Sequence, residues 1–328
     1  MTSGELKWPS LRGGFFLSDS FRIYLKTTAI FTNSFLLCAT DKEKAKHTMA
    51  TPQPQTMDPI FDDAALLRGR AWAANHFDDH IFSGATKDLK DRTDVLKTPF
   101  KDILDLSPGH TPGMLPPGTR YGDHKHWVRN TQPDYPENSF DLVYSPLALH
   151  WLEDPRSYLL KIHSILRPGG LFLANFWGGN ALTELRHCLA EVDFDMSGRI
   201  QPRIIPMMRL EDSNTLLQST PFELKVADQD TLTFYYADLT TLARHLRRMG
   251  EGNFLKNRAR TAPPRNFWPR VEKLYRKNYG KTNGEDDTIA LPATFQRITI
   301  TGWKNGPDIP KALKRGSASH SLEDALKP

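Results

Sequence analysis

The stretch Phe140-Asp-Leu-Val-Tyr144, followed by Arg167-Pro-Gly-Gly170 and Leu171-Phe-Leu-Ala-Asn-Phe176, decides the fold. Residues 140–144 and 171–176 are short apolar runs with the length of fully buried strands. Residues 158–166 between them have helical spacing, and the proline with two glycines ends that helix. A strand, a helix and a second strand in this order predict parallel strands joined by a helical crossover.

The flanking segments continue this alternation of strands and helices. Upstream, residues 103–106 predict a buried strand, and helical spacing predicts one helix that starts at Asp58 and Pro59 and another over 81–96. Downstream, the pattern predicts helices over 181–194, 239–249 and 270–279, a helix end at 215–218, strand pieces at 222–226 and 231–236 separated by a polar turn, and a last strand over 293–302. We therefore expect an α/β fold whose mostly parallel sheet carries helices on both faces.

The composition fits a globular protein and excludes several other classes. The chain has 328 residues, 39% of them hydrophobic, and a net charge of +5. The basic residues are scattered among acidic ones, which argues against a nucleic-acid partner. Cys38 and Cys188 form no metal-binding pair, so no zinc site is expected. The apolar run 29–39 is too short to cross a bilayer, which takes about 20 residues.

The chain divides into three regions by composition. Residues 1–56 mix apolar stretches with charges and end in a polar, proline-bearing linker. A targeting peptide, a disordered tail and a start codon placed too far upstream all fit, although Glu5 and Asp19 count against a transit peptide. We expect 1–56 to be a disordered extension or absent from the mature protein, 57–305 to form the domain, and 306–328 to be a flexible tail.

The loop after the first strand is the place to look for a ligand, since ligands of such sheets bind beyond the carboxyl ends of the strands. It reads Asp105-Leu-Ser-Pro-Gly109-His-Thr-Pro-Gly113. Gly109 would let the backbone approach a ligand, although a structural turn is an equal alternative. After the next strand, His150 and Trp151 stand where they could face a ligand or simply pack in the core.

Residues 138–176 resemble motif IV through the post-motif turn of class I S-adenosylmethionine-dependent methyltransferases. Distal stretches resemble one subfamily, the mitochondrial complex I assembly factors of methyltransferase type and their alphaproteobacterial relatives. These stretches are residues 180–186, 200–206, 248–253, 291–296 and 300–304. The resemblance covers about residues 58–325, and malonyl-acyl-carrier-protein O-methyltransferases are more distant cousins.

The resemblance implies a Rossmann-like fold that binds S-adenosylmethionine, without a metal. The residues it implies for the cofactor are Asp105, Ser107, Gly109, Asp123, Tyr144, His150 and Trp151. It also implies a protein substrate such as a respiratory complex I subunit, since the mitochondrial member is associated with hydroxylating an arginine of one. The location would be the cytoplasm in a bacterium, or the mitochondrial matrix or matrix face of the inner membrane in a eukaryote. Peripheral membrane association stays open.

The first part of the domain departs from the family pattern. Ser107 stands where the first glycine of the cofactor loop belongs, and Pro108 and Pro112 remove two backbone donors. The segment 113–141 is too short for two helices and two strands, so we expect the fold to be abbreviated between its first and fourth strands. Asp123 is the one candidate for a ribose-binding acid, with a solvated loop aspartate as the alternative. Two functions stay open: an S-adenosylmethionine-dependent methyltransferase, or hydroxylase on the same scaffold, and a non-catalytic assembly factor that has lost the cofactor.

Overall fold

The computed structural model describes residues 58–76, 80–96, 99–107, 115, 118–122, 135–282, 289–307 and 309. Its helices are α2 (Asp63–Ala74), α3 (His80–Asp94), η1 (Leu149–Trp151), α5 (Pro155–Ile165), α6 (Thr183–Ser197), α7 (Leu210–Gln218), α8 (Leu239–Arg248) and α9 (Phe267–Tyr279). Its strands are β1 (Ile103–Asp105), β2 (Arg120–Tyr121), β3 (Phe140–Pro146), β4 (Leu166–Trp177), β5 (Glu223–Tyr236), β6 (Lys281–Thr282) and β7 (Ile289–Trp303). Within these ranges, no helix is long and apolar enough to cross a membrane.

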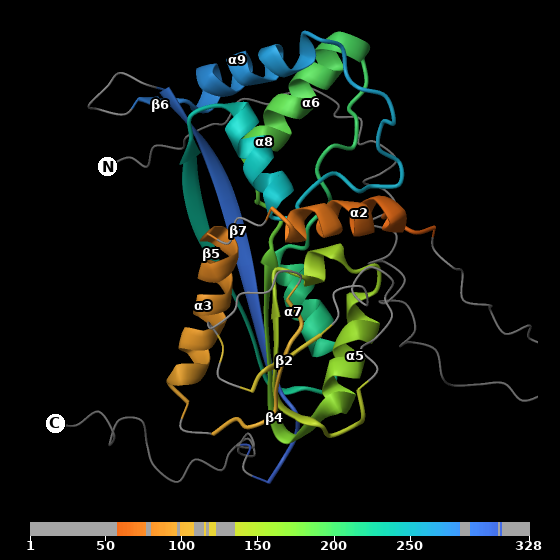
Figure 1. Ribbon diagram of the computed structural model, residues 1–328, viewed down its shortest axis with the longest axis vertical. Coiled ribbons are helices and arrows are strands. Elements are labelled where there is room, and N and C mark those ends of the chain that lie inside the picture. The colour runs from red at the N-terminus through yellow and green to blue at the C-terminus, as the bar shows by residue number, and fades with distance from the viewer. Residues whose placement is uncertain are drawn as a thin grey trace, which may run out of the picture. The chain divides into compact units, whose positions relative to one another are not determined.

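The strands form one sheet with the order β2-β1-β3-β4-β7-β5, and β6 pairs with β7 (Figure 1). The first four strands in this order are parallel, whereas β7 runs antiparallel to both β4 and β5. Between β1 and β3 the described residues contain a single strand, β2, of two residues. The predicted α/β fold, with a mostly parallel sheet abbreviated at this place, is confirmed.

Helices cover both faces of the parallel strands because the side chains alternate (Figure 1). On one face, Leu89 of α3 packs on alternate strand residues, which are Ile103, Leu142, Tyr144, Leu171 and Leu173. On the other, α5 and α7 pack on the residues between them, which are Leu104, Val143, Phe172, Ala174 and Phe176. Strands buried on both faces explain why the sequence shows continuous apolar runs there.

The antiparallel part of the sheet extends beyond the parallel strands. Trp177 at the end of β4 pairs with Arg297, and β7 then continues towards Leu291 with β5 as its partner. Helices α6, α8 and α9 gather on this extension and share a core with it (Figure 1). The extension therefore places a group of helices next to the carboxyl end of β4, where a parallel sheet binds its ligands.

The first helix starts later than predicted. The sequence indicated a start at Asp58 and Pro59, but α2 begins at Asp63, and the side chain of Asp62 accepts a hydrogen bond from the backbone of Ala65 at 3.1 Å. The residues before it are extended, since Phe61 forms a β-bridge with Leu255. This long-range pairing occupies the segment that local spacing assigned to the helix.

The predicted break within residues 222–236 is also wrong. These residues form one strand, β5, whose pairing with β7 continues from Val226 to Tyr236. The polar residues that suggested a turn are bound by arginines: Asp228 by Arg92 at 2.6 Å and Asp230 by Arg297 at 2.7 Å. Paired charges and a continuous partner strand let a polar run remain extended.

Candidate functional site

Asp105 ends β1 at the carboxyl edge of the sheet and is buried, with 1% of its surface exposed. Its two carboxylate oxygens accept hydrogen bonds from Ser107, one from the backbone N–H and one from Oγ, both at 2.9 Å. Burial raises the pKa of Asp105 to about 7, although the bonds from Ser107 oppose the rise. This carboxyl group therefore changes its charge near neutral pH.

The other residues predicted to bind a cofactor near β1 and β3 are in different situations. Tyr144 is buried beneath α3, with its hydroxyl 2.5 Å from Oγ1 of Thr93, and burial raises its pKa to about 12. Gly109 and Asp123 lie outside the described residues. The structure thus brings Asp105 and Ser107 together and holds the phenol of Tyr144 in the core, while its role in binding a cofactor stays a prediction.

His150 and Trp151 lie on η1, the short turn of helix that follows β3, and both are buried. Their side chains contact one carboxylate, that of Glu251. Nε2 of His150 is 3.1 Å from Oε1 of Glu251, and Nε1 of Trp151 donates to the same oxygen at 3.3 Å. With Nε2 directed at Glu251, Nδ1 of His150 has no hydrogen-bond partner among the described residues. The ring can therefore offer this nitrogen to a ligand.

Arg70 of α2 adds a positive charge to this buried group. Its guanidinium lies 5.5 Å from the centre of the Trp151 ring, and its Nε and Nη2 have no hydrogen-bond partner within the described part of the chain. Burial lowers the pKa of Arg70 to about 10, which the charge of Glu251 opposes. Burial alone would raise the pKa of Glu251, but His150 and Arg70 outweigh it, and the pKa lies below its usual value. Glu251 is therefore an anion held by two cationic or polar neighbours.

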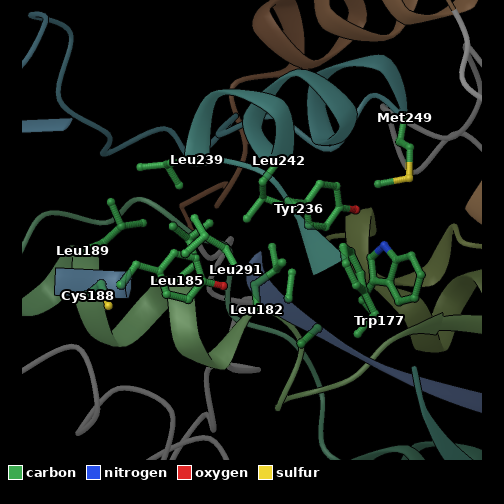
Figure 2. Close-up of a cluster of buried hydrophobic side chains, with 14 of the residues drawn as sticks. Trp177, Leu182, Leu185, Cys188, Leu189, Tyr236, Leu239, Leu242, Met249 and Leu291 are labelled. Carbon is green, nitrogen blue, oxygen red and sulfur yellow. The ribbon is translucent and has the colours of Figure 1, made fainter. Parts of the chain in front are cut away.

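A cavity of about 690 Å³ lies beside this group. Apolar side chains from α6, α8 and β7 form much of its wall, including Leu182, Leu185, Leu189, Leu239, Leu246 and Phe295. Figure 2 shows leucines of α6 and α8 directed towards one another between the two helices, with Trp177 and Met249 at one side. Trp151 and Glu251 also line the cavity, so the buried polar group reaches its wall. A cavity of this size and lining suits an organic ligand.

Sequence reasoning missed Glu251. The residue lies in the stretch 248–253 that resembles the family, but Gly250 and Gly252 beside it were interpreted as the end of a helix. Gly250 does adopt a positive φ of 78° after α8. The carboxylate between two glycines was the available indication, since glycines let the backbone turn sharply and carry a charged side chain inwards.

The strand order and the residues at its carboxyl edge define the class of protein. A parallel sheet with an antiparallel strand inserted before its last strand, an acid at the end of β1 and a His-Trp pair after β3 belong to the class I S-adenosylmethionine-dependent methyltransferase fold. A family model described as "Methyltransferase domain" matches residues 123–174.

Curated relatives narrow the assignment. The mitochondrial arginine-hydroxylase NDUFAF5 of Danio rerio is 34% identical over 193 residues, which cover 59% of this chain and 58% of that protein. A Rickettsia prowazekii protein with a methyltransferase name is 26% identical over 52% of this chain and 72% of its own length. Malonyl-acyl-carrier-protein O-methyltransferase of Xylella fastidiosa is 30% identical over 50% of this chain and 52% of its own. The chain is a methyltransferase-fold protein related to NDUFAF5.

These matches set limits on what is shared. The chain spans little more than half of the NDUFAF5 protein that it matches. Mitochondrial and bacterial relatives occur together, so they fit both of the predicted locations.

Proposed function

We propose that this protein binds S-adenosylmethionine at the carboxyl edge of β1, β2 and β3 and uses it to modify a protein. The observation that carries the proposal is the state of Asp105. Its carboxylate is buried, and no lysine or arginine of the described residues forms an ion pair with it. An unpaired buried carboxylate is unfavourable, and a ligand with an ammonium and a sulfonium group would supply the missing positive charge.

The residues around Asp105 fit such a ligand. Gly122 follows β2, and its backbone N–H donates to the carbonyl of Asp105 at 2.8 Å, which brings the ends of β1 and β2 together. Asp123 comes next in the sequence, where an acid can accept hydrogen bonds from ribose hydroxyls. Gly109 would allow the loop after β1 to approach the ligand closely. Ser107 would orient Asp105 through the two hydrogen bonds described above.

The chemistry that the cofactor supplies when bound is an electrophilic methyl group. The protein's own task is to align an acceptor and to accept the proton that the acceptor releases. His150 suits the second task, because Glu251 holds one ring nitrogen while the other has no partner among the described residues. Trp151 and Trp177 line the adjoining cavity and would exclude water from the acceptor.

The relatives suggest the acceptor. Several of them are named arginine-hydroxylases, so we propose an arginine side chain of a protein, and the resemblance to complex I assembly factors points to a respiratory complex I subunit. The same relatives favour hydroxylation on this scaffold as the outcome to compare with methylation.

A second candidate is a non-catalytic assembly factor. The occupied oxygens of Asp105 favour it, because Ser107 already donates to both of them. The two-residue strand β2 also favours it, since a short strand offers a small surface for a nucleoside.

Isothermal titration of S-adenosylmethionine into the full chain tests the proposal. We expect binding in the wild type and affinity about tenfold weaker or worse for Asp105→Asn, which keeps the shape but removes the charge. The matched control is Asp91→Asn on the exposed side of α3, which should bind as the wild type does. A folded wild type that takes up no ligand would exclude the enzyme and leave the assembly factor.

Mass spectrometry separates the two reactions. The full chain is incubated with the cofactor and a purified complex I subunit preparation, and arginine peptides are examined for added mass. A gain of one methyl group indicates a methyltransferase, and a gain of one oxygen atom indicates a hydroxylase. Cofactor binding without either gain would contradict the proposed acceptor.

A further inference from the structure

We propose that the cavity between α2, α6 and α8 is a binding site for an apolar ligand with an anionic head group, of the kind represented by a medium-chain carboxylate. The inference goes beyond the modification reaction, because it concerns a ligand that the cavity holds whether or not a cofactor is bound. It rests on the wall of the cavity and on the charges at its opening.

The interior of the cavity suits an apolar chain. Its volume of about 690 Å³ lies within the range of roughly 300–1,000 Å³ that holds small organic ligands. Leucines of α6 and α8 supply aliphatic surface, and Trp72, Trp151 and Trp177 supply aromatic surface. Transfer of an alkyl chain from water into such a space is favourable in proportion to the apolar area buried.

Two polar side chains inside the cavity already have partners. Arg203 forms an ion pair with Asp193, with two hydrogen bonds of 2.7 and 2.6 Å, and its guanidinium lies 4.1 Å from the centre of the Phe267 ring. Glu251 binds His150 and Trp151. Neither residue needs a ligand to satisfy its charge, so the interior does not ask for a charged group.

The opening differs, because its cations have no acidic partner. Arg68 of α2 and Arg247 of α8 both line the cavity and are both exposed, so they lie at its mouth. Neither forms an ion pair with a carboxylate of the described residues. Arg247 is held in place, with its guanidinium 4.0 Å from the centre of the Trp72 ring. Two arginines from adjacent helices beside an apolar interior match a carboxylate head with its chain inside.

The opposite charge on the ligand is thereby disfavoured. A cationic head would meet Arg68 and Arg247 at the mouth, and like charges at short range repel. Charge at the head group therefore becomes the variable that separates this proposal from simple apolar binding.

Calorimetric titration of the full chain with three ligands of equal chain length provides the test. Decanoate, decanol and decyltrimethylammonium are compared below the concentrations at which they form micelles. We expect decanoate to bind at least about tenfold more tightly than decyltrimethylammonium, with decanol between them. The titrations are repeated with saturating S-adenosylmethionine, so a failure of cofactor binding is recorded separately and leaves the result for decanoate unaffected.

Two variants locate the ligand. Arg68→Gln with Arg247→Gln should weaken decanoate about tenfold while decanol is unchanged, and Arg244→Gln, on the same helix but away from the cavity wall, is the matched control. Ala243→Trp at the lining should abolish binding of all three ligands, whereas Ala64→Trp on the exposed side of α2 should not. Thermal unfolding confirms that each variant is folded.

Several results would overturn the proposal. These are no heat with decanoate from the folded wild type, equal affinity for decanoate and decyltrimethylammonium, or unchanged decanoate affinity in the double arginine variant. The arginine positions are exposed, so this last comparison holds even if Ala243→Trp does not fold.

Discussion

The Nε2 atom of His150 lies 3.1 Å from the carboxylate of Glu251, a residue 101 positions further along the chain. His150 follows β3, whereas Glu251 follows α8, so one buried contact joins the parallel sheet to the helices beside it. Arg70 of α2 contributes the nearby positive charge. Three separate parts of the sequence thus depend on one carboxylate.

Replacing Glu251 by glutamine should destabilise the protein. The change removes the negative charge that offsets buried Arg70, and an uncompensated buried charge costs about 3 kcal/mol. Urea denaturation of the full chain measures the free energy of unfolding. The control is Glu191→Gln on α6, where the side chain is 45% exposed and its contact with His187 is 3.7 Å long. That change should alter stability by less than about 0.5 kcal/mol. Equal effects of the two changes would show that the buried carboxylate does not hold this group together.

The stability contributed by Asp105 should fall as the pH rises. Its folded-state pKa of about 7 lies above the usual value of 3.8, so the folded chain keeps a proton that the unfolded chain releases. The loss therefore begins near pH 4 and is complete above pH 7, and it amounts to about 4 kcal/mol at most. Asp105→Asn lacks this titration, so the difference in unfolding free energy between variant and wild type should grow over that window. Parallel profiles for the two proteins would contradict the raised pKa.

Saturating S-adenosylmethionine should reduce this pH dependence if it binds at Asp105. A cation beside the carboxylate lowers its pKa and stabilises the charged form. Repeating the unfolding series with the ligand tests this, and an unchanged slope would mean that the ligand binds elsewhere or not at all.

Arg203→Lys should weaken the link between α6 and α9. The guanidinium binds both oxygens of Asp193 and stacks on Phe267, and a lysine can reproduce neither geometry. We expect a loss of about 2 kcal/mol in the free energy of unfolding. Arg209→Lys is the control, since its side chain is 68% exposed beside Asp212 and a surface pair contributes little. A similar loss in both variants would argue for a general effect of shortening an arginine.

Two glycine substitutions should act in opposite directions. A Cβ at Gly302 of β7 would lie 2.7 Å from Cγ of Phe222, so Gly302→Ala should destabilise by about 1–3 kcal/mol. A Cβ at Gly84 of α3 would meet no atom within 4 Å, and Gly84→Ala should stabilise the helix by about 0.5–1 kcal/mol. Thermal unfolding midpoints measure both, and a Gly302→Ala protein as stable as the wild type would contradict the close packing of Phe222 on β7.

Much of the fold could be predicted from local pattern. The strands around residues 103–106, 140–144 and 171–176 are apolar runs because both faces of each are covered, and this property is visible in the residues themselves. The helix over 239–249 ends at Gly250 as predicted, because a glycine there accepts the positive φ that ends a helix.

The errors share a cause. The start of α2 and the continuity of β5 were both decided by strand partners far along the chain, Leu255 for Phe61 and β7 for residues 226–236. Local propensity is a weak preference of a few tenths to about 1 kcal/mol per residue, which pairing of this kind outweighs.

The sequence by itself determined the α/β alternation, the acid at the end of β1 and the His-Trp pair after β3, because each is written in contiguous residues. Only the tertiary structure decided which carboxylate meets His150, where Arg70 is buried, and that α2, α6 and α8 enclose a cavity with Arg68 and Arg247 at its mouth. Those relationships follow from the order of strands in the sheet and from the extension of β5 and β7, which bring helices distant in the sequence to one edge. Burial and charge pairing act through distances in space, and a one-dimensional pattern does not contain them.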